Sequence, residues 1–352
     1  MIKKLNNIIL DQDLEYINKE FKNKKIFLKK NILITGYEGF IGYELSNYFI
    51  KYFDMLKINT LYLLDVKKKR YKDKTKNKNI FFMQKDITKI DLEKTFKKNI
   101  DIIIHAASIA SPTFYRKYPI KTIESNIFGL NKILKYSKKK KVKKILYFSS
   151  SEIYGDPDER NIPTNETYNG NVSSIGPRAC YDEAKRMGET LCYVYNKEHN
   201  IPIVIVRPFN NYGPGLNIND KRLPADLAKN ILDDKNIKIF SDGSPTRSFC
   251  YIADAVIGYL NAICYSNFGV FNIGNDHEET SVKKLAETYL EIAKKNFNYK
   301  GKIIYKKNKE KDYLTNNPNR RLPNLLLART KIKYNPKIGL KEGVERYLNF
   351  LK

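Results

Sequence analysis

A tyrosine and a lysine four residues apart, Tyr181 and Lys185, lie in the stretch GPRACYDEAKRMGET (176–190), which reads as the start of a helix. Side chains at i and i+4 share one face of a helix, so the two groups can meet. Beside a cofactor, the cation would favour the phenolate form and make Tyr181 a usable base. The alternative is that both residues simply lie on the surface, because the chain is rich in tyrosine and lysine. The surrounding elements distinguish between these two interpretations.

Short apolar segments rich in β-branched residues alternate with helical patterns along the chain. These elements would position the Tyr181 and Lys185 pair. They are NILITG (31–36), TLYLLD (60–65), IFFMQKD (80–86), DIIIHAAS (101–108), KILYFSS (144–150) and PIVIVRP (202–208). Strands that are apolar throughout and separated by helices belong to a parallel sheet covered on both faces. The pattern predicts a doubly wound α/β fold.

Three glycines follow the first of these strands. Gly36, Gly39 and Gly42 in TGYEGFIGYEL allow a tight turn, close approach of a pyrophosphate and close helix packing, while the helix N-terminus offers unpaired N–H groups. Asp65, at the end of the second strand, can hold the ribose hydroxyls of an adenosine. The motif predicts dinucleotide binding with NAD as the cofactor, although KKKR (67–70) leaves NADP open.

The composition limits the possible domain organisation, location and metal content of the protein. A hydrophobic fraction of 42% in 352 residues is ample for the core of one large domain, or of a domain with a smaller lobe. No segment approaches the roughly 18–20 apolar residues of a membrane span, and the N-terminus does not read as a signal peptide, so we expect a cytoplasmic protein without a membrane partner. Four scattered cysteines and three histidines predict neither a disulfide framework nor a metal site.

The net charge of +27 raises nucleic acid as a possible partner. The lysines, however, are spread along the chain, and the densest clusters, KKKKVKK (138–144) and VKKKRYKDKTKNK (66–78), fall at expected loops or helix ends. Solvated faces are therefore the favoured interpretation, with no nucleic-acid partner. A negatively charged small molecule would also be attracted by this field.

The pattern of elements changes along the chain and suggests its organisation. We expect an added helical arm at 1–30, containing an amphipathic helix near 11–23. An NAD-binding Rossmann domain is expected at 31–207 and 251–275. After Pro208 the sequence becomes rich in Asn, Gly and Pro, and 208–250 with 276–352 is expected to form a smaller, mostly helical substrate-binding lobe.

Several longer stretches resemble one enzyme family. The glycine triplet, Tyr181 with Lys185, and YFSSSEIYG (147–155) resemble the extended short-chain dehydrogenase/reductases that modify nucleotide sugars, the NAD-dependent epimerase/dehydratase family. Within it the chain is most similar to UDP-glucuronate decarboxylases (UDP-xylose synthases). That similarity is carried by SPTFYRKYPIKTIESNIFGL (111–130), SSSEIYGDP (149–157), IGPRACYDEAKR (175–186), FNNYGP (209–214) and GSPTRSFCYIADAV (243–256).

The resemblance implies roles for individual residues. Tyr181 would take the proton of the sugar C4 hydroxyl, Lys185 would lower the pKa of Tyr181 and hold the nicotinamide ribose, and Ser150 would hydrogen-bond the C4 oxygen. Glu152 and Arg247 would complete the catalytic set near C5 and C6. The implied cofactor-binding residues are Gly36, Gly39, Phe40, Ile41, Gly42, Asp65, Asp86, Ile87, Ala106, Ala107, Asn126, Tyr181, Lys185 and Pro208. The implied substrate-binding residues are Ser151, Arg178, Asn210, Arg222, Arg247 and Arg321.

The resemblance also implies a reaction and an assembly. We expect decarboxylation of UDP-glucuronate, or a related nucleotide uronic acid, through a 4-keto intermediate, with tightly bound, recycled NAD. The alternatives are a nucleotide-sugar 4,6-dehydratase or 4-epimerase. Ser151 weakens the dehydratase reading, because a serine hydroxyl does not readily donate the proton that expels the C6 hydroxyl. Members of the family that only bind NAD tend to lack the catalytic tyrosine. Tyr181 is present here, which disfavours a protein that only binds the cofactor.

A homodimer is also implied, packed through the Tyr181 helix and a helix at 120–137. Two features depart from the family pattern: Gly215 stands where an arginine is usual, and the glycine triplet has unusual flanks, YEGFIGYEL.

Overall fold

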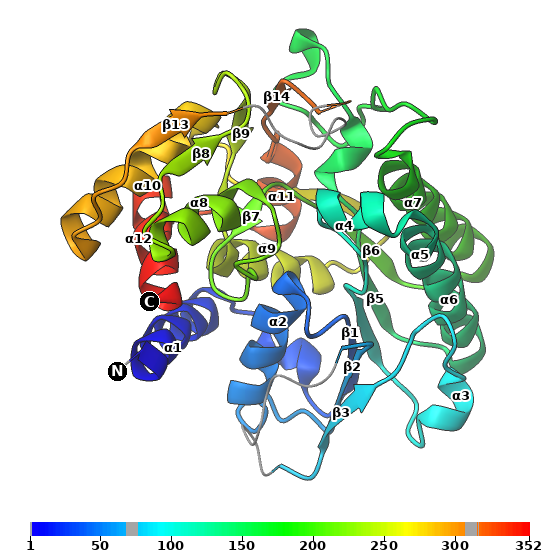
Figure 1. Ribbon diagram of the computed structural model, residues 1–352. Coiled ribbons are helices and arrows are strands. Elements are labelled where there is room, and N and C mark those ends of the chain that lie inside the picture. Colours follow the sequence, from blue (N-terminus) through cyan, green and yellow to red (C-terminus); the bar gives the residue numbers. More distant parts are fainter. Residues whose placement is uncertain (1, 68–76, 307–314, 316) are drawn as a thin grey trace.

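A seven-stranded parallel sheet forms the centre of the molecule (Figure 1). The computed structural model describes residues 2–67, 77–306, 315 and 317–352, with side chains from residue 8 onward. The strand order is β11-β6-β5-β4-β1-β2-β3. The strands are β1 (Asn31–Thr35), β2 (Thr60–Asp65), β3 (Ile80–Gln84), β4 (Ile102–His105), β5 (Lys144–Phe148), β6 (Ile203–Pro208) and β11 (Gly269–Ile273).

Alternate residues of these strands enter two separate cores. Ile32 and Ile34 of β1 face one core, and Leu33 between them faces the other. Helices α2 (Phe40–Lys51), α9 (Ile252–Ile263) and α11 (Leu326–Ile332) cover the first face, while α3 (Leu92–Thr95), α6 (Gly129–Lys140) and α7 (Ala179–His199) cover the second. This is the doubly wound arrangement that the six apolar segments predict, and β11 is the strand they did not indicate.

The helix expected at 120–137 is interrupted. Helices α4 (Pro112–Lys117) and α5 (Pro119–Ile123) lead into a π-helical turn, η2 (Glu124–Phe128), and only then into α6. A π-turn inserts one extra residue and rotates the side chains that follow, and such turns often occur at functional sites. Asn126 lies in this turn and is buried.

A smaller lobe lies above the carboxyl ends of the strands. Its helices are α8 (Leu223–Leu232), α10 (Val282–Phe297) and α12 (Leu340–Leu351). Its short strands pair as β12 (Glu279–Ser281), β9 (Thr246–Ser248) and β14 (Arg320–Arg321), as β7 (Asn211–Tyr212) with β10 (Cys250–Tyr251), and as β8 (Ile237–Ile239) with β13 (Ile303–Tyr305). Single turns are η1 (Lys24–Phe27), η3 (Ser151–Tyr154) and η4 (Glu159–Asn161). The division of the chain into a cofactor-binding and a substrate-binding part stays a prediction.

The N-terminal helix joins both parts of the molecule. Helix α1 (Ile2–Glu20) begins earlier than the helix expected near 11–23 and contacts α2, α9 and α12 (Figure 1). Leu10, Leu14 and Ile17, spaced three and four apart, are buried in the first core. Buried Asp13 accepts hydrogen bonds from Tyr251 at 2.6 Å and from Arg346 at 2.6 Å. The arm is therefore integral to the fold.

In the described parts of the chain, no helix has the length and apolar character needed to cross a membrane. The lysine-rich segment 66–78 lies mostly outside the described residues, as does most of KKKR (67–70), so the alternative cofactor NADP is not tested by this part of the structure.

Replacing Ile17 by Ala should lower the free energy of unfolding by about 2–5 kcal/mol, because it leaves a cavity where α1 meets the sheet core. The matched control is Ile8→Ala on the same helix, where the side chain is 45% exposed and the expected change is within about 0.5 kcal/mol. Thermal or urea unfolding measures both. Equal effects of the two variants would show that α1 contributes no core packing.

Candidate active site

The turn between β1 and α2 brings the chain unusually close to β4. Gly36 has φ +78°, a conformation that favours glycine, and a Cβ there would lie 2.6 Å from the backbone nitrogen of Ala107. A Cβ on Gly42 would collide with the carbonyl oxygen of Gly36. Gly39 is the N-cap of α2 and has no side chain with which to cap it. The first N–H groups of the helix, those of Phe40 and Ile41 included, are thus presented to an anion.

Asp65 reaches this turn from the end of β2. Its carboxylate accepts hydrogen bonds from the backbone N–H of Glu38 at 3.0 Å and of Lys67 at 2.9 Å. It is thereby fixed beside the glycine turn, and each oxygen retains lone-pair capacity for a ribose hydroxyl. The geometry fits the adenosine half of a dinucleotide.

The other expected cofactor residues fall into two groups. Ala106 and Ala107 follow β4 and meet the Gly36 turn, while Pro208 ends β6. The buried Asn126 donates to the carbonyl of Thr122 at 2.8 Å, and its Oδ1 atom has no hydrogen-bond partner among the described residues. A buried acceptor of this kind can receive a ligand donor, so Asn126 also fits a bound cofactor.

Asp86 and Ile87 have structural contacts of their own. The Asp86 carboxylate accepts from the backbone and hydroxyl of Thr88 at 2.9 and 2.8 Å, which fixes its own turn. Ile87 packs against Gly129 at the start of α6. Both residues lie after β3, at the edge of the sheet, and their part in cofactor binding stays a prediction.

Tyr181 and Lys185 lie on one face of α7, as the i, i+4 spacing predicts, and both are buried. The Lys185 ammonium donates to the carbonyl of Phe148 at 2.6 Å and lies 5.8 Å from the centre of the Tyr181 ring. The Tyr181 ring stacks on Tyr115 with centroids 5.0 Å apart. The surface-pair alternative is therefore excluded.

Burial opposes charge on both groups of this pair. It raises the pKa of Tyr181 to about 12, although a hydrogen bond from Ser150 lowers it. It lowers the pKa of Lys185 to about 7. A second positive charge would be needed nearby to favour the phenolate strongly, and the oxidised nicotinamide ring of NAD carries such a charge.

Ser150 and Ser151 open the turn η3 at the carboxyl end of β5. Ser150 is the N-cap, and its hydroxyl accepts from the backbone N–H of Glu152 at 3.2 Å. Ser151 is buried one residue further along the turn. The turn therefore holds Ser150 toward Tyr181 and presents Glu152 from the same short segment.

Glu152 is the centre of a charged cluster. Its carboxylate binds Arg178, which precedes α7, and Arg321 of β14, so it joins the sheet to the small lobe. Although burial alone would raise the pKa of Glu152, Arg178, Arg321 and Arg247 hold it well below its usual value. Glu152 is ionised at neutral pH.

Arg247 is paired with Arg321 across the small sheet, where the two residues are direct partners of β9 and β14. Its guanidinium donates to the carbonyls of Thr246 at 2.7 Å and Pro318 at 2.6 Å. Burial, and then the Arg321 cation, lower the pKa of Arg247 to about 10. The structure thus gathers three arginines and one carboxylate in one place.

Arg222 and Asn210 lie in the loops after β6. Arg222 is paired with Asp220 and stacks over the Phe40 ring, with 5.4 Å between the guanidinium carbon and the ring centre. Asn210 has a left-handed backbone (φ +37°), and its buried Nδ2 has no hydrogen-bond partner among the described residues. Arg222 is thereby fixed beside the first turn of α2, and Asn210 retains a donor for a polar ligand.

Sequence reasoning missed several residues that support the site. Buried Asp182 lies 3.4 Å from Arg178, and burial together with Glu152 raises the pKa of Asp182 to about 7. Tyr115 stacks on Tyr181, as described above. Both residues lie inside motifs quoted above, at 111–130 and 175–186, but their types and spacing alone gave no reason to single them out.

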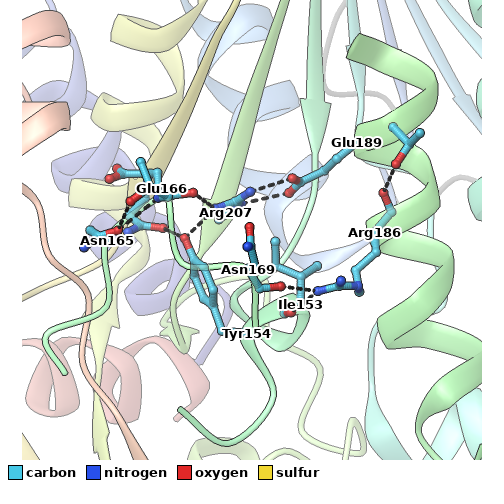
Figure 2. A network of polar contacts seen from close by, with 11 residues as sticks. Ile153, Tyr154, Asn165, Glu166, Asn169, Arg186, Glu189 and Arg207 are labelled. Carbon is cyan, nitrogen blue, oxygen red and sulfur yellow. Dashed lines mark hydrogen bonds and ion pairs between the residues drawn. The ribbon is translucent and has the colours of Figure 1, made fainter. Parts of the chain in front are cut away.

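A buried polar network behind the site was also missed. Figure 2 shows Arg207 of β6 bound to Glu189 of α7 and to the hydroxyl of Tyr154 at the end of η3. The Tyr154 hydroxyl also donates to Asn272 of β11 at 2.8 Å. The network ties together the elements that carry Lys185, Pro208 and Glu152.

The two departures from the family pattern meet in space. Gly215 has φ +85°, and a Cβ there would lie 2.6 Å from the ring of Tyr43 in the first turn of α2. Tyr43 belongs to the unusual flank of the glycine triplet. The bulky residue at 43 and the glycine at 215 therefore compensate each other.

The described residues contain no group of three or more His, Cys, Asp or Glu side chains arranged to hold a metal ion. The fold and the glycine turn define the class of dinucleotide-dependent enzymes, and the molecule also carries a buried Tyr/Lys pair on α7. The chain belongs to the NAD dependent epimerase/dehydratase family, whose model matches residues 32–274. The family confirms the resemblance read from the motifs and NAD as the cofactor.

Among its relatives, UDP-glucuronic acid decarboxylase 6 of Arabidopsis thaliana is 36% identical over 324 residues, covering 92% of this chain and 89% of that protein. UDP-glucuronic acid decarboxylase 1 of Xenopus tropicalis is 30% identical over 362 residues, covering 100% and 81%.

Solved structures of the same fold include 4-epimerases. UDP-glucose 4-epimerase of Thermotoga maritima, with UDP-glucose, has a TM-score of 0.78 and 26% identity, covering 91% of this chain and 98% of that one. UDP-glucuronic acid 4-epimerase of Bacillus cereus, with UDP-glucuronic acid and NAD, has a TM-score of 0.73 and 27% identity, covering 91% and 98%.

Replacing Gly36 by Ala should abolish retention of NAD, because the new Cβ would collide with the Ala107 backbone and force the turn away from the pyrophosphate. Gly339→Ala is the control, since a Cβ there meets nothing within 4 Å. Cofactor released from the denatured proteins measures the difference. Equal cofactor content in both variants would contradict the assignment of this turn.

Proposed function

We propose that this protein decarboxylates UDP-glucuronate, or a closely related nucleotide uronic acid, through a 4-keto intermediate. The observation that carries the proposal is the cluster of Glu152 with Arg178, Arg321 and Arg247 beside Ser150, whose hydroxyl hydrogen-bonds Tyr181. It supplies charged groups at the position where a sugar carboxylate must be handled. The names of the decarboxylase relatives support the same reading.

Gly36, Gly39 and Gly42 would hold NAD at the glycine turn, where it would supply the acceptor for the C4 hydride and its later return. Tyr181 takes the proton of the C4 hydroxyl, and Ser150 donates a hydrogen bond to the same oxygen. Lys185 holds the ribose and contributes positive charge near the phenolate. We therefore assign proton transfer at C4 to these three residues.

Oxidation at C4 makes the C6 carboxylate that of a β-keto acid, so carbon dioxide can leave. The developing enolate charge falls on the C4 oxygen, where Ser150 and Tyr181 are placed to stabilise it. An arginine clamp on the carboxylate itself would hold the charge in place and oppose its loss. Glu152 occupies Arg178 and Arg321 and so prevents that clamp.

Reprotonation at C5 completes the cycle. Glu152 is ionised at neutral pH, so it cannot donate this proton itself. We assign to Glu152 and Arg247 the ordering of a water molecule that does so. Return of the hydride to C4 then gives the pentose and leaves the cofactor ready for another turnover.

A 4-epimerase is the second candidate, favoured by the similarity to the Bacillus cereus protein. To separate the two, the protein is incubated with UDP-glucuronate, and with other nucleotide uronic acids and hexoses, and the products are identified by mass. Loss of carbon dioxide supports decarboxylation, unchanged mass with inverted C4 supports epimerisation, and loss of water from a hexose supports dehydration.

Tyr181→Phe should reduce turnover roughly 10²-fold or more while leaving bound NAD nearly unchanged, because it removes the base but not the ring. Tyr193→Phe, on an exposed position of the same helix, is the control. Steady-state rates and cofactor content are the measurements. Near-normal turnover of Tyr181→Phe would refute its role as the base.

Glu152→Gln should slow release of carbon dioxide about 10²–10³-fold, more than the initial oxidation at C4, because the arginines then become free to clamp the carboxylate. In a single turnover, the near-ultraviolet absorbance of reduced cofactor should therefore build up. Glu159→Gln, at an exposed site, is the control. Equal slowing of C4 oxidation and of carbon dioxide release would contradict a specific role of Glu152 in the decarboxylation step.

We also propose a homodimer packed through α5, α6 and α7, which lie side by side in Figure 1. Exposed apolar side chains gather there, including Ile120, Phe128 and Ile175. Ile123 and Met187 line a hollow of about 880 Å³ between these elements. An exposed apolar surface of this kind fits a second copy, since both copies would cover the same patch.

The double variant Ile120→Glu/Met187→Glu should be monomeric, because it places charges in the buried centre of this interface. Leu326→Glu, also at an exposed position but on α11, should leave the dimer intact. Analytical ultracentrifugation at micromolar concentration measures the mass. A wild-type monomer, or a dimer that persists in the double variant, would refute the interface.

The proposal includes two further elements. The cofactor is recycled, so the purified protein should retain it. A cytoplasmic location suits the four free thiols, which a reducing compartment preserves.

A further inference from the structure

Helix α7 carries an acid one turn after its catalytic lysine. Lys185 and Glu189 are i and i+4 neighbours, the spacing at which a lysine and a glutamate can form an ion pair. Both are largely withdrawn from solvent, so an ion pair between them would be stronger than on a surface. In the structure each is engaged elsewhere: Lys185 with the Phe148 carbonyl at 2.6 Å, and Glu189 with Arg207.

The bond between Glu189 and Arg207 is bidentate. The Arg207 Nε donates to Oε1 of Glu189 at 2.9 Å, and its Nη2 donates to Oε2 at 2.6 Å. Two further donors of the guanidinium are fixed by the Tyr154 hydroxyl at 2.6 Å and the Glu166 carbonyl at 2.8 Å (Figure 2). Arg207 is therefore rigidly held, and it holds both oxygens of Glu189 in turn.

We propose that Arg207 is a positioning residue that keeps Glu189 away from Lys185, so that the Lys185 ammonium remains free for the cofactor ribose and for Tyr181. The inference rests on the proposed role of Lys185. It holds for any reaction of this site that begins with oxidation at C4.

Release of Glu189 would change the charge that Lys185 presents to Tyr181. A free Glu189 would keep Lys185 protonated, but the resulting ion pair would present almost no net charge to Tyr181. The Tyr181 pKa would then rise, and so would the pH at which the base becomes active. The groups that face Lys185 are Tyr181, Glu189 and Cys192 of α7, Tyr147 of β5 and His105 of β4. Those that face Tyr181 are Ser150, Glu152, Asp182, Arg222 and Tyr115.

The test compares Arg207→Met with the double variant Arg207→Met/Glu189→Gln. In the single variant, Glu189 is released, so NAD content after purification should fall several-fold. The acid limb of kcat/KM should also move to higher pH by about one unit. In the double variant no carboxylate remains to capture Lys185, and both properties should return toward those of the wild type. Arg207→Gln is assayed in parallel, because its amide removes the cation and keeps a polar contact to Tyr154.

Tyr154→Phe is the matched control. It removes one bond to Arg207 and leaves the pair with Glu189, so the thermal midpoint should fall while NAD content and the acid limb stay in place. A double variant as poor in NAD and as shifted in pH as Arg207→Met would overturn the proposal, since the network would then act only on stability. Retention of NAD and of the acid limb in Arg207→Met would overturn it as well.

The cofactor measurement separates this inference from the proposed function. If the wild type decarboxylates no uronic acid, the proposed function fails, whereas loss and recovery of bound NAD across the Arg207 and Glu189 variants still test the positioning role directly.

Discussion

The ion pairs of the partly buried Glu152 carboxylate are the interactions on which the candidate site depends. It lies at the end of a strand of the large sheet and binds one arginine from the start of α7 and one from the small lobe. Removing a carboxylate from water is costly unless it is paired, so the ionised Glu152 requires both arginines at once. Glu152 thus links the two parts of the molecule, and the proposed function assigns it a role beside the sugar carboxylate.

The cost of burying a charge also governs Tyr181 and Lys185. Burial disfavours the phenolate and the ammonium alike, so in this low-dielectric pocket the charged form of each requires a partner. In the proposed mechanism, Lys185, the hydrogen bond from Ser150 and the charge of a bound nicotinamide would act together on the Tyr181 proton. Tyr181 would then be an effective base only with the cofactor bound, as required by the proposed removal and return of a hydride.

The sequence predicted most of the sheet and the shared helix face of Tyr181 and Lys185, because both depend on local periodicity. Six apolar segments correspond to strands, and the spacing of Tyr181 and Lys185 places them on one helix face. What it could not predict depends on contacts between distant segments. The register of β9 with β14 puts Arg247 beside Arg321, and no local pattern encodes a pairing of two-residue and three-residue strands. The early start of α1 was missed because its apolar positions are few and its partners lie in α9 and α12.

The distribution of charge differs between the inside and the outside of the molecule. Within the site, Glu152 is paired with Arg178 and Arg321, Asp182 lies beside Arg178, and Arg247 donates to backbone carbonyls, so the arginines outnumber the acids. Over the whole chain the excess is +27, most of it from lysines. An excess of one sign over a surface attracts oppositely charged ligands and raises their rate of encounter without fixing their orientation. The proposed substrate carries negative charge on its pyrophosphate and on its carboxylate, so this field would favour its arrival, whereas its orientation would depend on the fixed groups of the site.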